Sequence, residues 1–249
     1  MPKAKRKATL DTVWRYMSVA ELIGILERRR LVFHQFRKLR RHDRREGAIP
    51  NDLYERDPIL TGNPAAQLAG IRANEDIRFS TYVQCWHRAT REHSAFWQIY
   101  GNRGVALRSG IRLLKKQDFW TDLALQGEEI IYADTWAQAE KQGLSVPQGI
   151  TPNRSSLRLK RRAFSWEKEW RVFYRPPAKG FIDGRLPSAA RELERKELLS
   201  RWPAFEEISI NSFDWISVIL VAPAAPKWVA ASISALAGRH NVRCMKSKI

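Results

Sequence analysis

Two glutamates in the second half of the chain are the residues best suited to catalysis. Glu167 and Glu169 lie within residues 166–174, a segment rich in aromatic residues that we expect to form a strand. Side chains alternate along a strand, so Glu167, Glu169 and Arg171 would share one face. The arginine favours ionised carboxylates, whereas each carboxylate raises the pKa of the other. Such a pair suits general acid–base catalysis or stabilisation of a developing cation, although a solvated sheet edge could carry the same charges.

An aromatic segment with flanking histidines is the second feature. Residues 94–100 are expected to form a short helix carrying Trp97 and Tyr100. Core packing is the favoured use of these rings, and a platform for a nicotinamide or a base is the alternative. His87 and His93 are expected to be polar surface or capping residues. Beside one of the two glutamates, either histidine could instead serve a nuclease that needs no metal.

The third feature is the charge of the chain. Lysine and arginine number 44, and aspartate and glutamate 26, which gives a formal net charge of +18. Such a field attracts polyanions, of which nucleic acids are the most frequent; improved solubility or an acidic partner protein is the alternative. Arginine predominates in two runs with few interleaved acids, which suits contacts to phosphate. The residues expected to contact nucleic acid are Arg29, Arg37, Lys38, Arg40, Arg41, Arg44, Arg45, Arg158, Lys160, Arg161 and Arg162.

Composition excludes several classes of protein. Cys85 and Cys244 are the only cysteines and form no CxxC pair, and the five histidines are scattered. Neither a disulfide framework nor a metal site is therefore expected, and no glycine-rich phosphate-binding loop occurs. The longest apolar run, residues 215–223, is far shorter than the ~20 residues that span a bilayer. We expect a cytoplasmic protein that does not enter the membrane.

The organisation of the chain predicts a basic arm followed by one domain. Residues 1–9 are expected to be disordered, and residues 10–249 to form a single compact domain with a basic insertion near 36–64. Ser18 and Glu21 have the spacing of a capping box, which predicts a helix start. In the first half we expect strands at 12–17, 31–33, 78–86 and 104–108, and helices at 18–29, 64–72 and 94–100.

The C-terminal third has the clearest pattern. Strands at 215–221 and 242–245 enclose a helix at 226–237, which predicts a parallel β-α-β unit with a right-handed crossover. The alternation elsewhere is irregular, so the expected fold class is α+β, with a mixed, strongly bent sheet flanked by helices. In the second half we also expect strands at 130–132 and 166–174, and helices at 154–162 and 188–200.

Three short matches resemble the Arg–Ser–Glu pattern of mono-ADP-ribosyltransferases. They are Arg15 in an early strand, Ser80 in a central strand, and the Glu-x-Glu of Glu167 and Glu169. The resemblance implies that NAD is the cofactor, that Arg15 grips its pyrophosphate, and that Ser80 braces the nicotinamide-ribose pocket. It also implies that Glu169 stabilises the ribosyl cation while Glu167 orients the acceptor, since an oxocarbenium-like centre needs a nearby anion. A structural pairing of Arg15 with Glu169 is the alternative.

The chain also resembles, over a greater length, the bacterial family called domain of unknown function 2971. The similarity runs from Trp14 to about Val242 and supports the fold more than a reaction. Residues 37–60 depart from the family, in which a shorter loop is expected. The matching segments are Trp14-Arg15-Tyr16, Leu31-Val32-Phe33, Cys85-Trp86-His87, residues 97–107, Ile131-Tyr132, Lys160, residues 167–171 and residues 216–223.

Together these features favour an ADP-ribosyltransferase-like enzyme that uses NAD and acts on nucleic acid, or is recruited to it. A role as a toxin or antiviral effector is implied by the resemblance alone. The first alternative is a non-catalytic nucleic-acid-binding protein, or a subunit that joins a partner protein in a larger complex. The second alternative is a metal-independent nuclease.

Overall fold

The computed structural model describes most of the chain. The described residues are 11–41, 43, 45–49, 52–53, 61–100, 104–144, 154–177, 197 and 202–249, without the side chains of Arg40, Arg41, Tyr100 and Arg154. The predicted basic arm, most of the predicted helix at 188–200 and parts of the predicted insertion at 36–64 lie outside the described residues.

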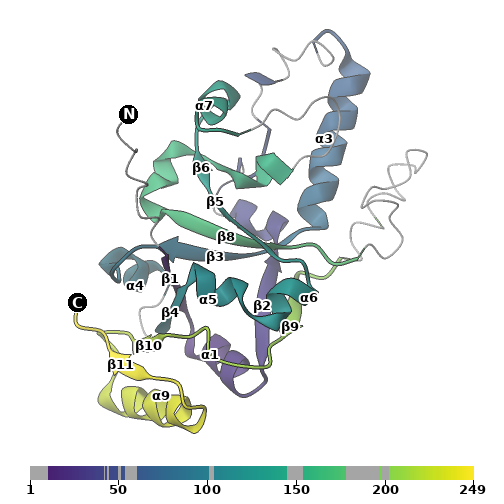
Figure 1. The fold of residues 1–249 in the computed structure, drawn as a ribbon. Coiled ribbons are helices and arrows are strands. Elements are labelled where there is room, and N and C mark those ends of the chain that lie inside the picture. Colours follow the sequence, from purple (N-terminus) through teal and green to yellow (C-terminus); the bar gives the residue numbers. More distant parts are fainter. Residues whose placement is uncertain are drawn as a thin grey trace, which may run out of the picture. The chain divides into compact units, whose positions relative to one another are not determined.

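The fold belongs to the α+β class, as the sequence predicts. A mixed sheet of nine strands is flanked by helices, and a second sheet has two strands (Figure 1). The chain divides into two compact units. Unit 1 comprises Met1–Leu31, Cys85–Ala124 and Ile208–Ile249, and unit 2 comprises Val32–Gln84 and Leu125–Glu207.

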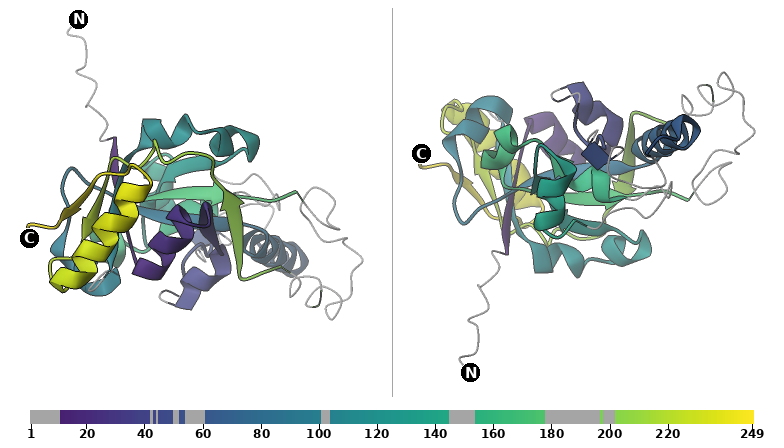
Figure 2. Two further views of the ribbon diagram at one scale, coloured as in Figure 1. Left: turned by 90° about the horizontal axis from the view of Figure 1, so that it is seen from below. Right: turned by 90° about the horizontal axis from the view of Figure 1, so that it is seen from above.

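Unit 1 contains four neighbouring strands of the nine-stranded sheet, in the order β11-β10-β4-β1. β1 (Thr12–Met17) is antiparallel to β4 (Val105–Gly110), and β4 is antiparallel to β10 (Val218–Val221). β10 pairs in parallel with β11 (Cys244–Lys246), and helix α9 (Lys227–Arg239) connects the two strands. The predicted parallel β-α-β unit is therefore confirmed. Figure 2 shows α9 lying along this part of the sheet, beside α1.

The start of helix α1 (Val19–Leu26) follows the sequence prediction in detail. Ser18 Oγ accepts the Glu21 N–H at 3.2 Å, and Glu21 Oε2 accepts the Ser18 N–H at 3.1 Å. These reciprocal bonds satisfy amide groups that have no partner within the helix, so the predicted capping box is confirmed. The other helices of unit 1 are α4 (Ser94–Tyr100), α5 (Ile111–Lys115) and α6 (Asp118–Asp122).

Unit 2 contains two pairs of strands. It also includes parts of other strands that continue into unit 1. β5 (Gln126–Glu129) pairs antiparallel with β8 (Glu169–Tyr174). β6 (Ile131–Tyr132) pairs in parallel with β7 (Leu159–Lys160) to form the two-stranded sheet. The remaining elements with residues in this unit are β2 (Arg30–Gln35), β3 (Tyr82–Arg88), β9 (Phe205–Ser209), α3 (Pro64–Phe79), α7 (Trp136–Lys141) and the 3-10 helices η1 (Phe36–Arg41), η2 (Arg154–Arg158) and η3 (Arg162–Glu167).

The predicted strand at 78–86 is wrong at its beginning. Helix α3 continues to Phe79, Ser80 caps it with an N–H that donates to Asp76 O, and β3 starts only at Tyr82. Arg78 in the last turn is buried, and its Nε donates to Gly47 O at 3.0 Å. This tertiary contact holds the last turn as helix, although β-forming residues follow directly.

The predicted helix at 154–162 and the beginning of the predicted strand at 166–174 are also wrong. Residues 154–167 form two 3-10 helices separated by β7, and β8 starts at Glu169. Pairing of β7 with β6 interrupts helix formation, since a strand in a ladder bonds to its neighbour strand. Lys168 then adopts the left-handed conformation with φ of 43°, which ends η3 and redirects the chain into β8.

Aromatic side chains dominate the core of each unit. In unit 1, Trp86 and Trp215 are fully buried with ring centroids 6.2 Å apart. In unit 2, Trp136 is fully buried in one apolar cluster, and Phe36 and Phe173 belong to another. Large rings contribute much of the apolar area that stabilises a domain.

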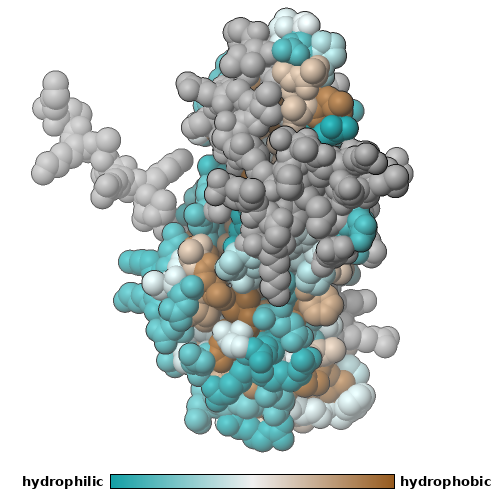
Figure 3. Space-filling view, turned by 90° about the vertical axis from the view of Figure 1, so that its right-hand side faces the viewer, coloured by the Kyte–Doolittle hydropathy of each residue, from teal (hydrophilic) through white to brown (hydrophobic). Residues whose placement is uncertain are grey.

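The face drawn in Figure 3 is mainly polar in its lower part, where hydrophilic residues lie around smaller hydrophobic areas. The side chain of Trp228 in α9 stands out because it is 72% exposed. In the part of the chain that the structure describes, no helix has both the length and the apolar character needed to cross a membrane.

Candidate functional site

A cluster of buried charges lies in unit 2, with Lys160 at its centre. The Lys160 ammonium is 2.5 Å from Glu167 Oε2, 3.1 Å from Glu169 Oε2 and 3.6 Å from Glu46 Oε1. None of these four residues is more than 8% exposed. Three carboxylates therefore converge on one ammonium group where little water remains to screen them, and their interactions are stronger than at the surface.

Arg171 completes the cluster from β8 and is fully buried. Its Nε donates to Glu169 Oε1 at 2.7 Å and its Nη2 to Glu46 Oε1 at 2.5 Å. Its Nη1 donates to Leu157 O at 2.9 Å, and its guanidinium lies 5.2 Å from the Phe36 ring centroid. Glu169 is thus held by Lys160 on one oxygen and by Arg171 on the other, so its charge is compensated on both sides.

Three consecutive short elements bring the cluster together. Lys160 is the last residue of β7, Glu167 the last of η3, and Glu169 the first of β8. The left-handed turn at Lys168 separates the two glutamates, so they do not belong to one strand. The prediction that they share one face of a strand is therefore wrong, and they meet instead at the ammonium group of Lys160.

The groups of the cluster differ in how firmly they hold their protons. Burial alone disfavours the Lys160 ammonium, but the carboxylates of Glu169 and Glu46 outweigh burial and raise the pKa of Lys160. Burial raises the pKa of Glu167, and the bond to Lys160 only partly opposes this. Lys160 therefore holds its proton more firmly than an ordinary lysine, and Glu167 has a higher pKa than an ordinary glutamate.

Tyr132 of β6 borders the cluster. Its hydroxyl accepts the Glu169 N–H at 2.8 Å, which fixes the first residue of β8. Burial, more than any other cause, raises the pKa of Tyr132, and the nearby carboxylates add to this effect. The hydroxyl therefore stays protonated across the physiological range and can also act as a hydrogen-bond donor.

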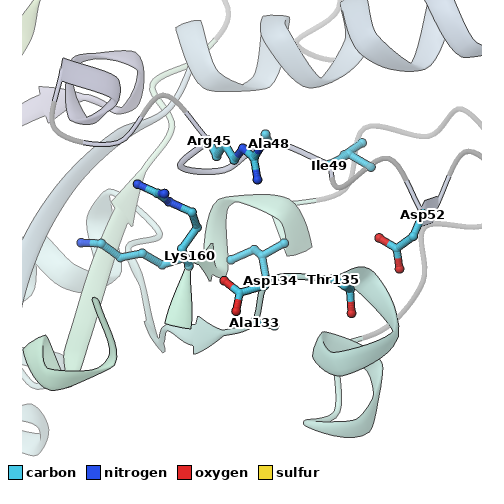
Figure 4. Close-up of a pocket in the computed structure, with 10 residues that line it drawn as sticks. Arg45, Ala48, Ile49, Asp52, Ala133, Asp134, Thr135 and Lys160 are labelled. Carbon is cyan, nitrogen blue, oxygen red and sulfur yellow. The ribbon is translucent and has the colours of Figure 1, made fainter. Parts of the chain in front are cut away.

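A pocket of about 340 Å³ adjoins the cluster in unit 2. Lys160 belongs both to the cluster and to the lining of the pocket. Figure 4 shows that its side chain points away from Asp52 and Thr135, which lie on the other side of the pocket. Asp52 accepts the N–H groups of Trp136 and Ala137 at 2.9 and 3.2 Å, which fixes the start of α7.

The other charges at the pocket are Asp134, Arg45 and Arg161. Asp134 Oδ1 accepts the Arg162 N–H at 3.2 Å. Arg45 is exposed, and Arg161 is partly exposed with its Nε 2.9 Å from Oδ2 of the buried Asp43. Asp52 and Asp134 at the pocket thus serve backbone amides, while two arginines, Arg45 and Arg161, also line it.

Arg15, the predicted pyrophosphate ligand, lies in β1 of unit 1, whereas Ser80, Glu167 and Glu169 lie in unit 2. The Arg15 guanidinium is buried and 3.3 Å from Glu21 Oε1, and burial lowers the pKa of Arg15 more than Glu21 raises it. Its partner is thus the glutamate of the capping box. Its alternative pairing with Glu169 is not observed among the described contacts.

Ser80 and the aromatic candidates are buried within their own units. Ser80 is 1% exposed and its Oγ donates to Ile77 O at 3.4 Å. Trp97 is 3% exposed, packs against Tyr16 and donates from Nε1 to Glu92. The Tyr100 side chain lies outside the described residues. Trp97 therefore contributes to packing, as the favoured interpretation of this segment predicts.

The histidines considered for a nuclease lie in unit 1. His87 is buried and stacks on Phe96 with centroids 4.3 Å apart, so the prediction of a surface residue is wrong for it. His93 is exposed, and its Nδ1 accepts the Ala95 N–H. His93 thus caps the first turn of α4, as predicted.

The predicted nucleic-acid ligands divide by environment. Lys160 is buried among carboxylates and is unavailable to a partner. Arg158 bridges to Glu128 at 2.8 Å, and Arg29 donates to Asn211 O. Arg37, Arg45 and Arg162 are exposed, and Lys38 is half-buried. Arg44 and the side chains of Arg40 and Arg41 lie outside the described residues.

Two residues of the cluster, Glu46 and Tyr132, were not predicted as site residues. Glu46 is one of two acids in the first basic run, with Asp43, and such exceptions to a charge run are the signal that could have identified it. Tyr132 has no comparable signal, because its contact with Glu169 depends on the path of the chain between β6 and β8.

In comparisons with known proteins, no family model and no curated protein matches this chain.

Proposed function

We propose that the protein binds nucleic acid and that a phosphate group of this ligand enters the pocket of unit 2. The observation that carries the proposal is the distribution of charge at the pocket. Asp52 and Asp134 are bonded to backbone amides, whereas Arg45 is exposed and Arg161 has N–H donors besides the one that bonds Asp43. Guanidinium groups match the oxygens of a phosphate, and the net charge of +18 attracts a polyanion over a longer range.

The test compares Arg45→Ala with Lys141→Ala, because both side chains are exposed in unit 2 and only Arg45 lines the pocket. Binding of a fluorescent oligonucleotide is measured over a range of salt concentrations. Each lost contact to single-stranded phosphate should reduce the slope of log K against log salt by about 0.7. We expect this reduction in Arg45→Ala alone. Equal behaviour of the two variants contradicts the role of the pocket, and absence of binding by the wild-type protein at low salt contradicts the proposal as a whole.

ADP-ribosyl transfer from NAD is the second candidate. It is favoured by one observation: Lys160 lines the pocket, and its ammonium bonds the two glutamates of the Glu-x-Glu sequence. In this reaction the bond between nicotinamide and ribose breaks, its electron pair leaves with nicotinamide, and a carboxylate stabilises the ribosyl cation until an acceptor oxygen or nitrogen attacks. Glu169 would have to exchange one of its two cationic partners for the ligand.

The test of this candidate is thermal melting with and without millimolar NAD. NAD at a hundred times its Kd should add about 2.7 kcal/mol of stability, which is several degrees. Loss of this shift in Arg45→Ala would place NAD in the pocket, and loss in Arg15→Ala would support the role that the family resemblance gives to Arg15. If the wild-type protein shows no shift at any NAD concentration, the candidate is wrong.

A further inference from the structure

A second cavity, of about 510 Å³, lies on the sheet of unit 1. Four cationic side chains line it: Arg108 of β4, and Arg243, Lys246 and Lys248 on and beside β11. All four are exposed. None of them belongs to the two basic runs that the sequence singles out, and sheet pairing alone brings Arg108 beside the C-terminal cations.

The floor of this groove is apolar and follows the strand register. Arg108 is the pairing partner of both Trp14 in β1 and Val218 in β10, so these three residues form one row across the sheet face. Leu220 pairs with Met245 in the row next to it. Paired residues of neighbouring strands point to the same face, so the apolar side chains of these rows lie beneath the cations. Trp14, Val218 and Leu220 are buried, and Met245 is the most exposed part of this floor.

One acid, Glu92, also lines the groove, but its carboxylate already accepts hydrogen bonds from neighbouring residues. Its Oε2 accepts Trp97 Nε1–H at 2.9 Å and Ser247 Oγ–H at 2.6 Å, and its Oε1 accepts the Lys248 N–H at 3.5 Å. The carboxylate therefore anchors α4 and the C-terminal segment to each other. Among the described residues, no salt bridge joins this carboxylate to a guanidinium or ammonium group of the groove, so the charge of these groups is available to a ligand.

Two of the cations, Arg108 in β4 and Lys246 in β11, are placed by strands. The Arg108 guanidinium lies 5.7 Å from the Trp14 ring centroid, a cation–π contact that limits its rotation. The Lys246 ammonium lies 3.5 Å from Ala225 O. Groups held on strands lose less conformational freedom on binding than groups on long loops, so they bind the same ligand more tightly.

We infer that this groove binds single-stranded nucleic acid, with phosphates at the four cations and base faces against the apolar floor. The inference rests on the proposed function. It gives nucleic acid a second binding surface, the groove of unit 1, in addition to the pocket of unit 2. A single strand presents phosphates and unstacked base faces together, which matches a groove that is cationic and apolar at once. A duplex keeps its base faces inside the stack, so it could use only the cations.

The experiment compares two double variants of the full chain that remove the same charge. Arg108→Ala/Arg243→Ala removes two cations of the groove, and Lys115→Ala/Lys116→Ala removes two exposed cations at the end of α5 that do not line it. Each protein is titrated with oligodeoxythymidine of about 20 nucleotides and with a duplex of equal length, over a range of salt concentrations. Circular dichroism checks that both variants fold.

For the single strand, the groove variant should reduce the slope of log K against log salt by about 1.4, because two phosphate contacts of about 0.7 each are lost. The α5 variant should retain the wild-type slope. The wild-type protein should bind the single strand more tightly than the duplex at equal salt.

Three outcomes would overturn the inference. Equal losses in the two double variants would mean that only net charge matters, and an unchanged groove variant would mean that nucleic acid binds elsewhere, with the proposed function intact. Equal binding of duplex and single strand, with both reduced in the groove variant, would contradict the role of the apolar floor. If the wild-type protein binds neither oligonucleotide, the proposed function itself fails.

Discussion

The buried cluster of unit 2 and the groove of unit 1 use positive charge in opposite ways. Unit 2 buries Lys160 and Arg171 against three glutamates, whereas unit 1 displays four cations around an apolar groove whose one acid is bonded to other donors. A buried cation satisfied by carboxylates fixes the surrounding chain but exerts little field outside. An exposed cation contributes little to stability and attracts anions. Burial, more than residue type, therefore separates the structural cations from those that can bind a ligand.

The largest effect should follow from removing the centre of the buried cluster. Lys160→Met keeps the length of the side chain but leaves Glu46, Glu167 and Glu169 with less compensation, which should cost about 3–5 kcal/mol. Lys141→Met, at an exposed position of α7, should change stability by less than about 0.5 kcal/mol. Urea denaturation measures both. A small effect in Lys160→Met would show that the cluster contributes little to the fold.

The next effect concerns the two glutamates. Glu169→Gln removes the negative charge that Lys160 and Arg171 share and replaces one of the two accepting oxygens by an amide donor. Glu167, in contrast, bonds Lys160 through Oε2 and already has a raised pKa because of its burial. We expect Glu169→Gln to cost about 2–3 kcal/mol and Glu167→Gln about 1 kcal/mol. The same denaturation experiment ranks them. The reverse order would assign the main structural role to Glu167.

Alkaline pH should weaken unit 2. The pKa of Lys160 is raised in the folded state, so its contribution is complete below its ordinary value of 10.5 and is lost as pH rises above that value. The raised pKa of Tyr132 acts in the same direction above its ordinary value of 10.0. For each group the free energy of unfolding falls by up to about 1.4 kcal/mol per pH unit.

Melting temperatures measured between pH 9 and pH 12 would show this decline, with the pH range chosen to include both ordinary pKa values. In Lys160→Met the decline should be shallower, since only the tyrosine remains of the two groups. An equal slope in both proteins would mean that other groups control the alkaline transition.

The smallest effect concerns the helix start in unit 1. Ser18→Ala removes the oxygen that accepts the Glu21 N–H and should cost about 1 kcal/mol. Ser232→Ala in α9 is the matched control, because Ser232 Oγ only bonds Trp228 O within its own helix, and this change should be close to neutral. Thermal denaturation of the two variants tests the difference. Similar values for both would imply that tertiary contacts hold α1 without its cap.

Local patterns predicted unit 1 better than unit 2. The capping box at Ser18 and the β-α-β unit around α9 depend on residues close together in sequence, and both are confirmed. In unit 2, the segment 154–162 departs from its predicted helix because β7 pairs with β6, and α3 extends beyond its predicted end because Arg78 bonds Gly47. Contacts between distant segments overrode local preference at these places, and no periodicity within the segments reveals such contacts.

The sequence by itself determined the α+β class, the capping box at Ser18, the C-terminal β-α-β unit and the excess of positive charge. Only the tertiary structure decided that Glu167, Glu169 and Glu46 meet at Lys160, and that Arg108 joins the C-terminal cations around the groove. The reason is physical. Helix starts and strand alternation arise from interactions within a few residues, whereas the burial and grouping of charges depend on how the chain folds back on itself.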